Sequence, residues 1–579
     1  MKYIVSYEHP HNHYIDIEFI AEKIRGGETL IQLPAWRPGR YELGNFAKNI
    51  QKWGAFDENG NALKFEKITK DCWKVFSKGA KQLHIKYNYY AVDLNAGSTF
   101  LDETQLYMNP VNCCVYIPDR INEECQMELI LPEKYKVACG MKEIGKNIFS
   151  ANDFHELADS PFIASATLQH NMFVYEGTEF NIWFQGECKP DWGKVINDFF
   201  IFINEQYMMM KDFPFEVYHF FFQILPTKFY HGVEHLNSTV IALGPSYNLM
   251  KGELYEDMLG VSSHELFHSW NIKSIRPKEM LPYDYTKENY SKLGYVAEGV
   301  TTYYGDLFLY RSGVFSEVDY LKTVEERLQK HLDNFGRYNL SVADSSFDNW
   351  LDGYTPGVPN RKTSIYDEGS LLSFITDVFI RKNSENRNSL DDVMRYLYFD
   401  YAKQKKGYTE TNYKKAVEEF GGAKYDDIFD LYVHGANTYE DAFKDALDYI
   451  GCELMHSPSK KFCERYYGFK VAETAGKAII TAVYPGSIAD IAELRTGDEL
   501  LLVNDMQVKG DGSGTNLNEW LTYFAANAIK LILTNNGVAR ITRLIVTKEE
   551  FYPQYHIQKR KTSTDAQKKN YHLWAKHPF

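Results

Sequence analysis

The sequence has few cysteines, no long apolar run and no basic domain. Its 8 cysteines are dispersed over 579 residues without a CxxC pair, which argues against a disulfide framework and favours a reducing compartment. No apolar run approaches the ~18 residues that a membrane helix needs. The first residues, "MKYIVSYEHPHNHYIDIEF", have a strand pattern and lack the apolar core of a signal peptide. We expect a soluble, cytoplasmic protein, unless a leader has been removed.

The lack of a basic domain argues against nucleic-acid binding. The formal net charge is −14 at pH 7, and binding to phosphates requires a domain that concentrates Lys and Arg. Only the segment 558–569, "QKRKTSTDAQKK", is basic, and so short a charge run is predicted to be solvated. We therefore expect neither a nucleic-acid partner nor a membrane partner.

The hydrophobic pattern divides the chain into four parts, since 579 residues are too many for one core. Residues 1–165 have the short, turn-separated segments typical of strands in a sandwich. Residues 166–455 change to a helical period, and residues 456–548 return to strands interrupted by a helix pattern at 516–526. Residues 549–579 are polar, without a strong period, and are predicted to form a tail. The predicted fold class is multidomain α+β, with an N-terminal β-sandwich-like domain, a mostly α-helical domain and a strand-rich C-terminal domain.

The stretch "SHELFHSW" at 263–270 places two histidines four residues apart around a glutamate. Residues four apart share one face of a helix, so His264 and His268 can direct imidazole nitrogens at one metal ion. Glu265 lies about 100° around the helix and can reach a water on that metal without binding the metal. An accidental match has a chance on the order of a few per cent. The pattern predicts a metal site.

A catalytic zinc ion needs a third protein ligand from a following segment. The nearby carboxylates are Asp284, Glu288, Glu298 and Asp306. Asp284 and Glu288 lie in a loop-like stretch, where charges are most often solvated. Glu298 lies in "YVAEGVTTYYG", among apolar and aromatic residues, and a buried carboxylate needs a compensating cation. We predict Glu298 as the third ligand, with Asp306 as the second choice, and one Zn²⁺ per chain.

These motifs resemble a known family. "HELFHSWNIKSIRP" at 264–277 and "EGVTTYYGDL" at 298–307 are similar to the glycyl aminopeptidase family of gluzincin metallopeptidases, and "LPAWRPGRY" at 33–41 is similar to that family's N-terminal signature. The resemblance covers nearly the whole chain. It implies an N-terminal β-domain, a thermolysin-like catalytic domain and a C-terminal PDZ domain at 456–548. It also implies His264, His268 and Glu298 as zinc ligands and Glu265 as general base.

The same resemblance implies a site for the substrate's free amine. Gly232-Val233-Glu234-His235 is similar to a stretch on an edge strand beside the zinc, whose glutamate holds the α-amino group in this family, so Gly232, Glu234 and His235 are expected to bind substrate. His231 stands where the family has a glycine, so the entrance of the pocket is expected to differ. On spacing alone, Glu234 could equally be a solvent-facing residue of an edge strand.

Tyr366 in "SIYDEGSLLSF" at 364–374 matches a Tyr-x-Lys-Gly motif of related gluzincins, in which the phenol donates a hydrogen bond to the oxyanion. Glu368 replaces the lysine of that motif. In the C-terminal module, "RYYGFKV" resembles the carboxylate-binding loop of PDZ domains, which implies that Tyr467, Gly468 and Phe469 receive a peptide C-terminus. A PDZ fold used only as structural support is the alternative.

The function predicted from the sequence is a zinc aminopeptidase that acts on peptides with a free N-terminus. The family resemblance suggests that it releases small residues, glycine or alanine. Two alternatives stay open: an endopeptidase whose PDZ domain captures its substrates, and a peptide-binding scaffold with a vestigial metal site.

Overall fold

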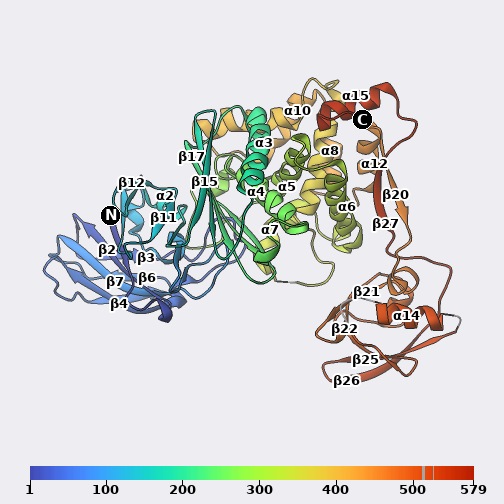
Figure 1. Ribbon diagram of the computed structural model, residues 1–579, viewed down its shortest axis with the longest axis horizontal. Coiled ribbons are helices and arrows are strands. Elements are labelled where there is room, and N and C mark those ends of the chain that lie inside the picture. Colours follow the sequence, from blue (N-terminus) through green and yellow to red (C-terminus); the bar gives the residue numbers. More distant parts are fainter. Residues whose placement is uncertain (356, 511–514, 526) are drawn as a thin grey trace.

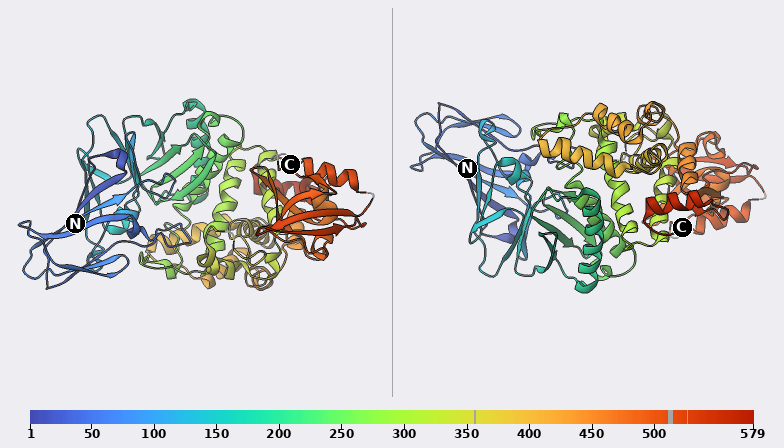
Figure 2. Two further views of the ribbon diagram at one scale, coloured as in Figure 1. Left: turned by 90° about the horizontal axis from the view of Figure 1, so that it is seen from below. Right: turned by 90° about the horizontal axis from the view of Figure 1, so that it is seen from above.

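The computed structural model describes residues 1–355, 357–510, 515–525 and 527–579. A sheet-rich N-terminal domain lies at one end, a helical domain occupies the centre, and a smaller sheet domain lies at the other end (Figure 1). Views from below and from above show the same order (Figure 2). The multidomain α+β architecture expected from the sequence is therefore present.

The N-terminal domain is built from three sheets, with strand orders β12-β13-β10-β1-β2-β7-β4, β11-β14-β9-β8 and β3-β6-β5. Alternate residues of β2 (Tyr14–Glu22) are buried, as a sheet with one face on a core requires. Residues of the seven-stranded and four-stranded sheets share one apolar core. The remaining strands and helices of this domain are β1 (Lys2–Ser6), β3 (Thr29–Gln32), β4 (Ile50–Asp57), β5 (Phe65–Thr69), β6 (Cys72–Val75), β7 (Gln82–Tyr90), β8 (Phe100–Leu101), β9 (Gln105–Met108), α1 (Pro110–Cys113), β10 (Cys125–Leu129), β11 (Lys136–Cys139), β12 (Lys142–Gly145), β13 (Ile148–Ala151), α2 (Phe154–Ala158) and β14 (Phe162–Ser165).

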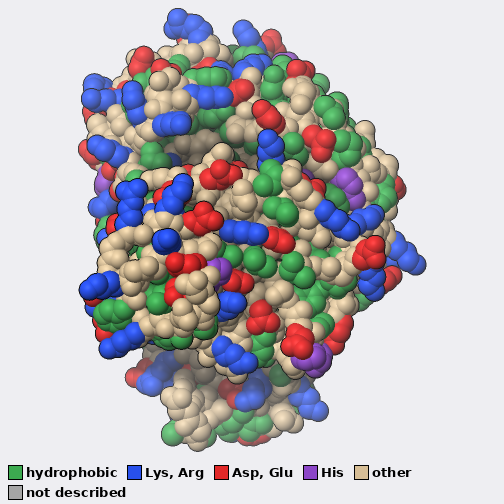
Figure 3. All heavy atoms as spheres, turned by 90° about the vertical axis from the view of Figure 1, so that its left-hand side faces the viewer, with side chains coloured by type: hydrophobic (Ala, Val, Ile, Leu, Met, Phe, Trp, Pro, Cys, Tyr) green, Lys and Arg blue, Asp and Glu red, His purple; other side chains and the backbone are tan. Residues whose placement is uncertain are grey.

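On the face of the molecule seen from the N-terminal end, Lys and Arg side chains are interspersed with Asp and Glu side chains (Figure 3). In the part of the chain that the structure describes, no helix is both long and apolar enough to cross a membrane.

The central domain begins with a five-stranded sheet in the order β15-β16-β17-β19-β18. Strands β16, β17 and β19 are parallel, whereas β18 runs antiparallel to β19 and ends the order. An outer strand of this kind leaves backbone N–H and C=O groups without a sheet partner. The strand bounds are β15 (Gln169–Tyr175), β16 (Thr178–Gln185), β17 (Val217–Ile224), β18 (Phe229–Glu234) and β19 (Ser238–Gly244).

Helix α5 (Gly294–Arg311) is the central helix of this domain, and Asp306 is the one residue between Tyr295 and its end that is not buried. A helix that is covered all round belongs to the middle of a core. The other helices are α3 (Trp192–Met210), α4 (Glu253–His268), α6 (Glu317–Asp333), α7 (Val342–Asp352), α8 (Asp367–Asn383), α9 (Leu390–Tyr396), α10 (Glu410–Gly421), α11 (Asp426–Ile428) and α12 (Glu440–Tyr449).

Glycines let α5 cross α8 with their backbones in contact. A Cβ built on Gly299 would overlap the backbone of Gly369, and a Cβ on Gly369 would lie 2.8 Å from the carbonyl oxygen of Tyr295. Any larger side chain would push the helices apart. This crossing brings the start of α8 next to Glu298.

The C-terminal sheet domain is an insertion in a two-stranded ribbon. β20 (Cys452–Ser457) pairs antiparallel with β27 (Gln554–Lys559), with Ser457 opposite Gln554. The inserted domain, residues 458–553, contains β21 (Phe469–Thr474), β22 (Lys477–Val483), α13 (Ile488–Ile491), β23 (Glu499–Val503), β24 (Met506–Gln507), α14 (Thr515–Phe524), β25 (Ile529–Asn535) and β26 (Val538–Leu544). The helix predicted at 516–526 corresponds to α14, and residue 526 lies outside the described residues.

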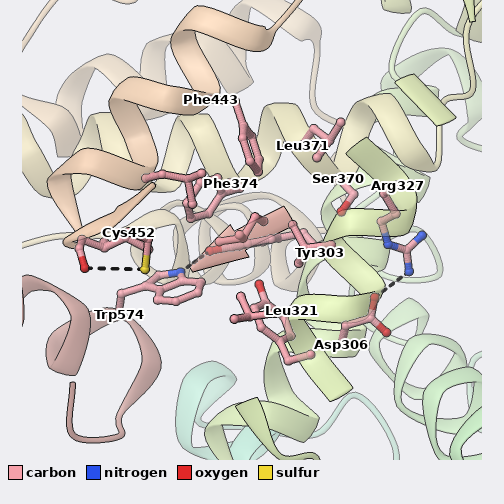
Figure 4. Close-up of a pocket in the computed structure, with 15 residues that line it drawn as sticks. Tyr303, Asp306, Leu321, Arg327, Ser370, Leu371, Phe374, Phe443, Cys452 and Trp574 are labelled. Carbon is pink, nitrogen blue, oxygen red and sulfur yellow. Dashed lines mark hydrogen bonds and ion pairs between the residues drawn. The ribbon is translucent and has the colours of Figure 1, made fainter. Parts of the chain in front are cut away.

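Residues 549–579 differ from the polar tail predicted from the sequence. They form β27 and then α15 (Asp565–Ala575), which returns to the helical domain. Trp574 is buried there and donates a hydrogen bond of 2.9 Å from Nε1 to the hydroxyl of Tyr303 (Figure 4). Only Tyr571, Trp574 and Ala575 of α15 are buried, so the apolar period of this Lys- and Gln-rich helix is too sparse to predict it.

Candidate metal centre and substrate cleft

Three donor side chains from α4 and α5 converge on one point. The ligand atoms of His264, His268 and Glu298 all lie within 4.8 Å of one another. Nε2 of His268 lies 3.0 Å from Nε2 of His264 and 3.3 Å from Oε2 of Glu298. Gly305 permits this approach, because a Cβ there would lie 3.1 Å from the Cα of His264. Two imidazoles and one carboxylate are the donor set of a catalytic zinc site, so the residues present fit a zinc ion.

Hydrogen bonding fixes the orientation of the His268 ring. Its Nδ1 lies 2.8 Å from the carbonyl oxygen of Asn271, just beyond the end of α4. A ring N–H that donates to a carbonyl leaves the Nε2 lone pair free for a metal. That lone pair faces His264 and Glu298.

A residue of the N-terminal domain holds the third ligand. The hydroxyl of Tyr41 donates a hydrogen bond of 2.7 Å to Oε1 of Glu298, which leaves Oε2 for the metal. Burial and the Glu298 carboxylate raise the pKa of Tyr41 well above its ordinary value, so the hydroxyl keeps its proton. Tyr41 ends the stretch "LPAWRPGRY". The sequence pattern marked that stretch as a signature but did not indicate a contact with the metal site.

Replacing Tyr41 with Phe is expected to weaken metal binding about 10- to 100-fold, as for other residues that orient a metal ligand. The measurement is zinc affinity by competition with a chelator. Tyr87→Phe is the matched control, because the hydroxyl of Tyr87 donates to the carbonyl oxygen of Cys113 in the same domain and is remote from the ligands. Equal affinities for the two variants would show that the Tyr41 hydroxyl does not support Glu298.

Glu265 is buried beside the ligands and is not one of the three converging residues. A Cβ on Gly232 of β18 would overlap its carboxylate, so only glycine fits at that position. Among the described residues, Oε2 of Glu265 has no hydrogen-bond partner. Burial, opposed by His268 and assisted by Glu234, raises the pKa of Glu265 to about 8. Burial therefore makes the Glu265 carboxyl group bind a proton more tightly than an exposed glutamate does.

Glu234 ends β18 at one end of the same cleft and is 7% exposed. Gly39, from the N-terminal domain, has a φ of 77°, and a Cβ on it would overlap the Glu234 carboxylate. The hydroxyl of Tyr354 donates a hydrogen bond of 3.1 Å to the carbonyl oxygen of Gly39. The N-terminal domain thus covers this end of the cleft.

The cleft has a volume of about 750 Å³ and is lined by the candidate ligands together with Gly39, Gly232, Glu234, Glu265, Tyr354 and Tyr366. His231 also lines it, and burial together with Arg37 and Arg40 lowers the pKa of His231 to about 4. His231 is therefore neutral at physiological pH.

Tyr366 lies immediately before α8, next to Glu298. Burial and the Glu298 carboxylate raise its pKa well above the ordinary value, so its hydroxyl can donate a proton in a hydrogen bond. Glu368, which departs from the related motif, is buried away from the metal site, and its Oε2 lies 2.7 Å from Nδ1 of His331. The departure at Glu368 therefore does not alter the lining of the cleft.

Three other residues named from the sequence are engaged in other contacts. Asp306, the second choice for a ligand, lines the cleft but is directed at Arg327, with 2.5 Å between Oδ2 and Nη2 (Figure 4). Asp284 accepts hydrogen bonds from Thr286 within its own loop. His235, which is predicted to bind substrate, is buried, and its Nδ1 lies 3.1 Å from Oδ1 of Asp159. It follows the last residue of β18 and is not among the residues that line the cleft.

The predicted carboxylate loop of the C-terminal module closes a helical turn. Tyr467 and Phe469 are buried in the core of the inserted domain. The N–H of Gly468 donates to the carbonyl oxygen of Glu464 at 3.2 Å, and a Cβ on Gly468 would overlap Ser487. The N–H of Gly468 is thus already engaged. The PDZ assignment of this domain stays a prediction.

The site and fold together define a metallopeptidase: two histidines and a glutamate from successive helices, with a second buried glutamate beside them in a cleft. A model of the Peptidase M61 N-terminal domain matches residues 2–166, and a model of the M61 glycyl aminopeptidase matches residues 257–372. Both models belong to the M61 peptidase family, which is the family that the sequence motifs predicted.

A solved structure shares the fold over nearly the whole chain. An aminopeptidase N family protein from Idiomarina loihiensis has a TM-score of 0.89 and 23% sequence identity, covering 99% of each chain. An M1 zinc metallopeptidase from Deinococcus radiodurans, a mutant bound to a Tyr-Ser-Ala substrate, has a TM-score of 0.48 and 12% identity over 75% of this chain and 93% of that one. No curated protein matched the chain by sequence.

Proposed function

We propose that the protein is a zinc-dependent aminopeptidase that releases small N-terminal residues, glycine or alanine, from peptides. The observation that carries the proposal is the position of Glu234, a buried carboxylate at the covered end of the cleft that contains His264, His268 and Glu298. A carboxylate there can pair with the protonated α-amine of a substrate and place its first peptide bond over the metal. The match of residues 257–372 to the M61 glycyl aminopeptidase model supports the preference for small residues.

Zinc held by His264, His268 and Glu298 would supply a Lewis acid that polarises the scissile carbonyl and activates water. Glu265 accepts a proton from the attacking water and passes it to the leaving amine. The Tyr366 hydroxyl donates a hydrogen bond to the oxyanion that develops on the carbonyl oxygen. Glu234 anchors the amine throughout the reaction.

The test of this function is an assay of glycyl and alanyl substrates with free and with N-acetylated amino termini, together with metal analysis. We expect about one zinc per chain, cleavage of the free-amine substrates, and little cleavage of the acetylated ones. Comparable cleavage of both would favour the endopeptidase alternative. Absence of both zinc and hydrolysis would favour the scaffold alternative.

Replacing Tyr366 with Phe is expected to lower turnover about a hundredfold or more, with little change in KM, because one oxyanion donor is lost. Steady-state kinetics on a free-amine glycyl substrate measure this effect. Tyr295→Phe is the matched control, since the buried Tyr295 hydroxyl on the adjacent α5 has no hydrogen-bond partner among the described residues. A parent-like rate for the Tyr366 variant would reduce Tyr366 to a packing residue.

The cysteines support a reducing compartment, and we propose that the protein is located in the cytoplasm. All 8 cysteines are free, and seven of them are buried. Binding of a peptide C-terminus by the inserted domain also remains part of the prediction.

A further inference from the structure

Asp159, in the N-terminal domain, contacts two segments next to the site: the turn after Glu234 and the loop after α4. Asp159 follows α2, and its side chain is only 20% exposed. Its Oδ2 accepts a hydrogen bond of 2.9 Å from the backbone N–H of Leu236. Its Oδ1 lies 3.1 Å from Nδ1 of His235 and 2.6 Å from Nζ of Lys273.

The first two contacts hold the turn directly after Glu234. His235 and Leu236 connect β18 to β19, and the N–H of His235 donates to the carbonyl oxygen of Ser238 at 2.9 Å. Glu234 is the residue immediately before this turn. Fixing the backbone of the turn therefore fixes the place of the Glu234 carboxylate.

The third contact holds the loop directly after the metal-binding helix. The N–H of Lys273 donates to the carbonyl oxygen of His268 at 3.0 Å. The same loop contains Asn271, whose carbonyl oxygen faces Nδ1 of His268. A displacement of Lys273 would therefore move the segment that orients the His268 ring.

The link between Asp159 and Lys273 is a buried ion pair. The Lys273 side chain is 2% exposed. Burial would raise the pKa of Asp159, but Lys273 and His235 outweigh it and hold that pKa well below the usual range. Removing one partner of such a pair leaves an uncompensated buried charge, so the contact persists while the protein is folded.

We propose that Asp159 is a positioning residue that sets the separation between Glu234 and the metal-binding helix, and so directs cleavage to the first peptide bond. The inference rests on the proposed aminopeptidase function. Both segments are bound to the carboxylate of Asp159, which belongs to a different domain. The position of the N-terminal domain therefore determines the distance between the amine anchor, Glu234, and the metal.

The test is Asp159→Asn, which keeps the size of the side chain and removes its charge. We expect KM for a free-amine glycyl substrate to rise about tenfold or more, with kcat changed less than about threefold, because a misplaced anchor weakens productive binding. The ratio of kcat/KM for free-amine over N-acetylated substrate is expected to fall about tenfold or more. Zinc content is expected to stay at the parent level.

Asp153→Ala is the matched control. Asp153 is the N-cap of α2, the helix that Asp159 follows, and accepts a hydrogen bond of 2.8 Å from the N–H of Glu156. This variant is expected to lower thermal stability and to leave the substrate ratio unchanged. If Asp159→Asn does not fold, the double variant Asp159→Ala, Lys273→Met removes the unpaired buried charge together with the side-chain contacts to residues 235–236.

An unchanged substrate ratio in the folded Asp159 variant would overturn the proposal, as would a fall in kcat alone that accompanies lost stability. Failure of the proposed function is visible separately, in the parent enzyme. If the parent cleaves acetylated and free substrates equally well, it has no preference for a free amine that Asp159 could support. Both the proposed function and this inference are then wrong.

Discussion

Replacement of Glu265 with Gln is expected to leave zinc bound and to lower turnover by about 10²- to 10⁴-fold. The amide cannot accept the proton of the attacking water. It has nearly the size of the carboxylate, so it fits against Gly232, where there is no room for a larger side chain. The three converging ligands do not include Glu265, so metal affinity should not change.

The measurement combines kcat on a free-amine glycyl substrate with zinc content of the same preparation. Glu256→Gln is the matched control: Glu256 is exposed, on the same helix, and lines the cleft, and its loss should change kcat less than about threefold. Loss of zinc in the Glu265 variant would place Glu265 among the ligands. Retained turnover would mean that another group accepts the proton.

The sequence was sufficient for the parts of the site that lie close together in the chain. His264, Glu265 and His268 share a helix whose period predicts their arrangement. Glu298 was found because it is a carboxylate in an apolar helical stretch, and α5 is buried as that pattern indicated. The helical period predicted for residues 166–455 is present in this region, for example in α5 and α6.

The contacts made by the N-terminal domain were not predictable in this way. Tyr41 lies 257 residues before Glu298, and Asp159 lies 114 residues before Lys273. No hydrophobic period or spacing links residues so far apart. In a chain with 43 tyrosines, a single Tyr has no pattern that marks it as a partner of a ligand. The contact of His235 was not predictable for the same reason, because its ring meets Asp159, which lies 76 residues earlier in the chain.

The inserted domain shows a different limit. The strands predicted for residues 456–548, interrupted by one helix, are present as β21–β26 and α14. The pairing of β20 with β27, however, joins segments about a hundred residues apart, and no pattern in the sequence indicates its register. Because Ser457 lies opposite Gln554, a two-residue turn can close this ribbon without residues 458–553.

Replacement of Glu234 with Ala is expected to remove the preference for a free amino terminus. A protonated amine loses hydration when it enters the covered end of the cleft, and the buried carboxylate restores that energy. Loss of one partner from such a pair costs about 2–5 kcal/mol, which corresponds to roughly 30-fold to several thousand-fold in kcat/KM. Glu234 is not one of the three converging residues, so zinc should remain bound.

The measurement is kcat/KM for matched glycyl substrates with free and N-acetylated termini, in the parent and in Glu234→Ala. The free-amine substrate should lose at least about tenfold, whereas the acetylated substrate has no charge to pair and should lose little. Glu234→Gln separates charge from size, because the amide fills the same space beside Gly39 and cannot neutralise an ammonium. Equal losses for both substrates would mean that Glu234 supports the strand instead of the amine. A parent that already cleaves acetylated peptides as readily as free ones would make the cleft that of an endopeptidase.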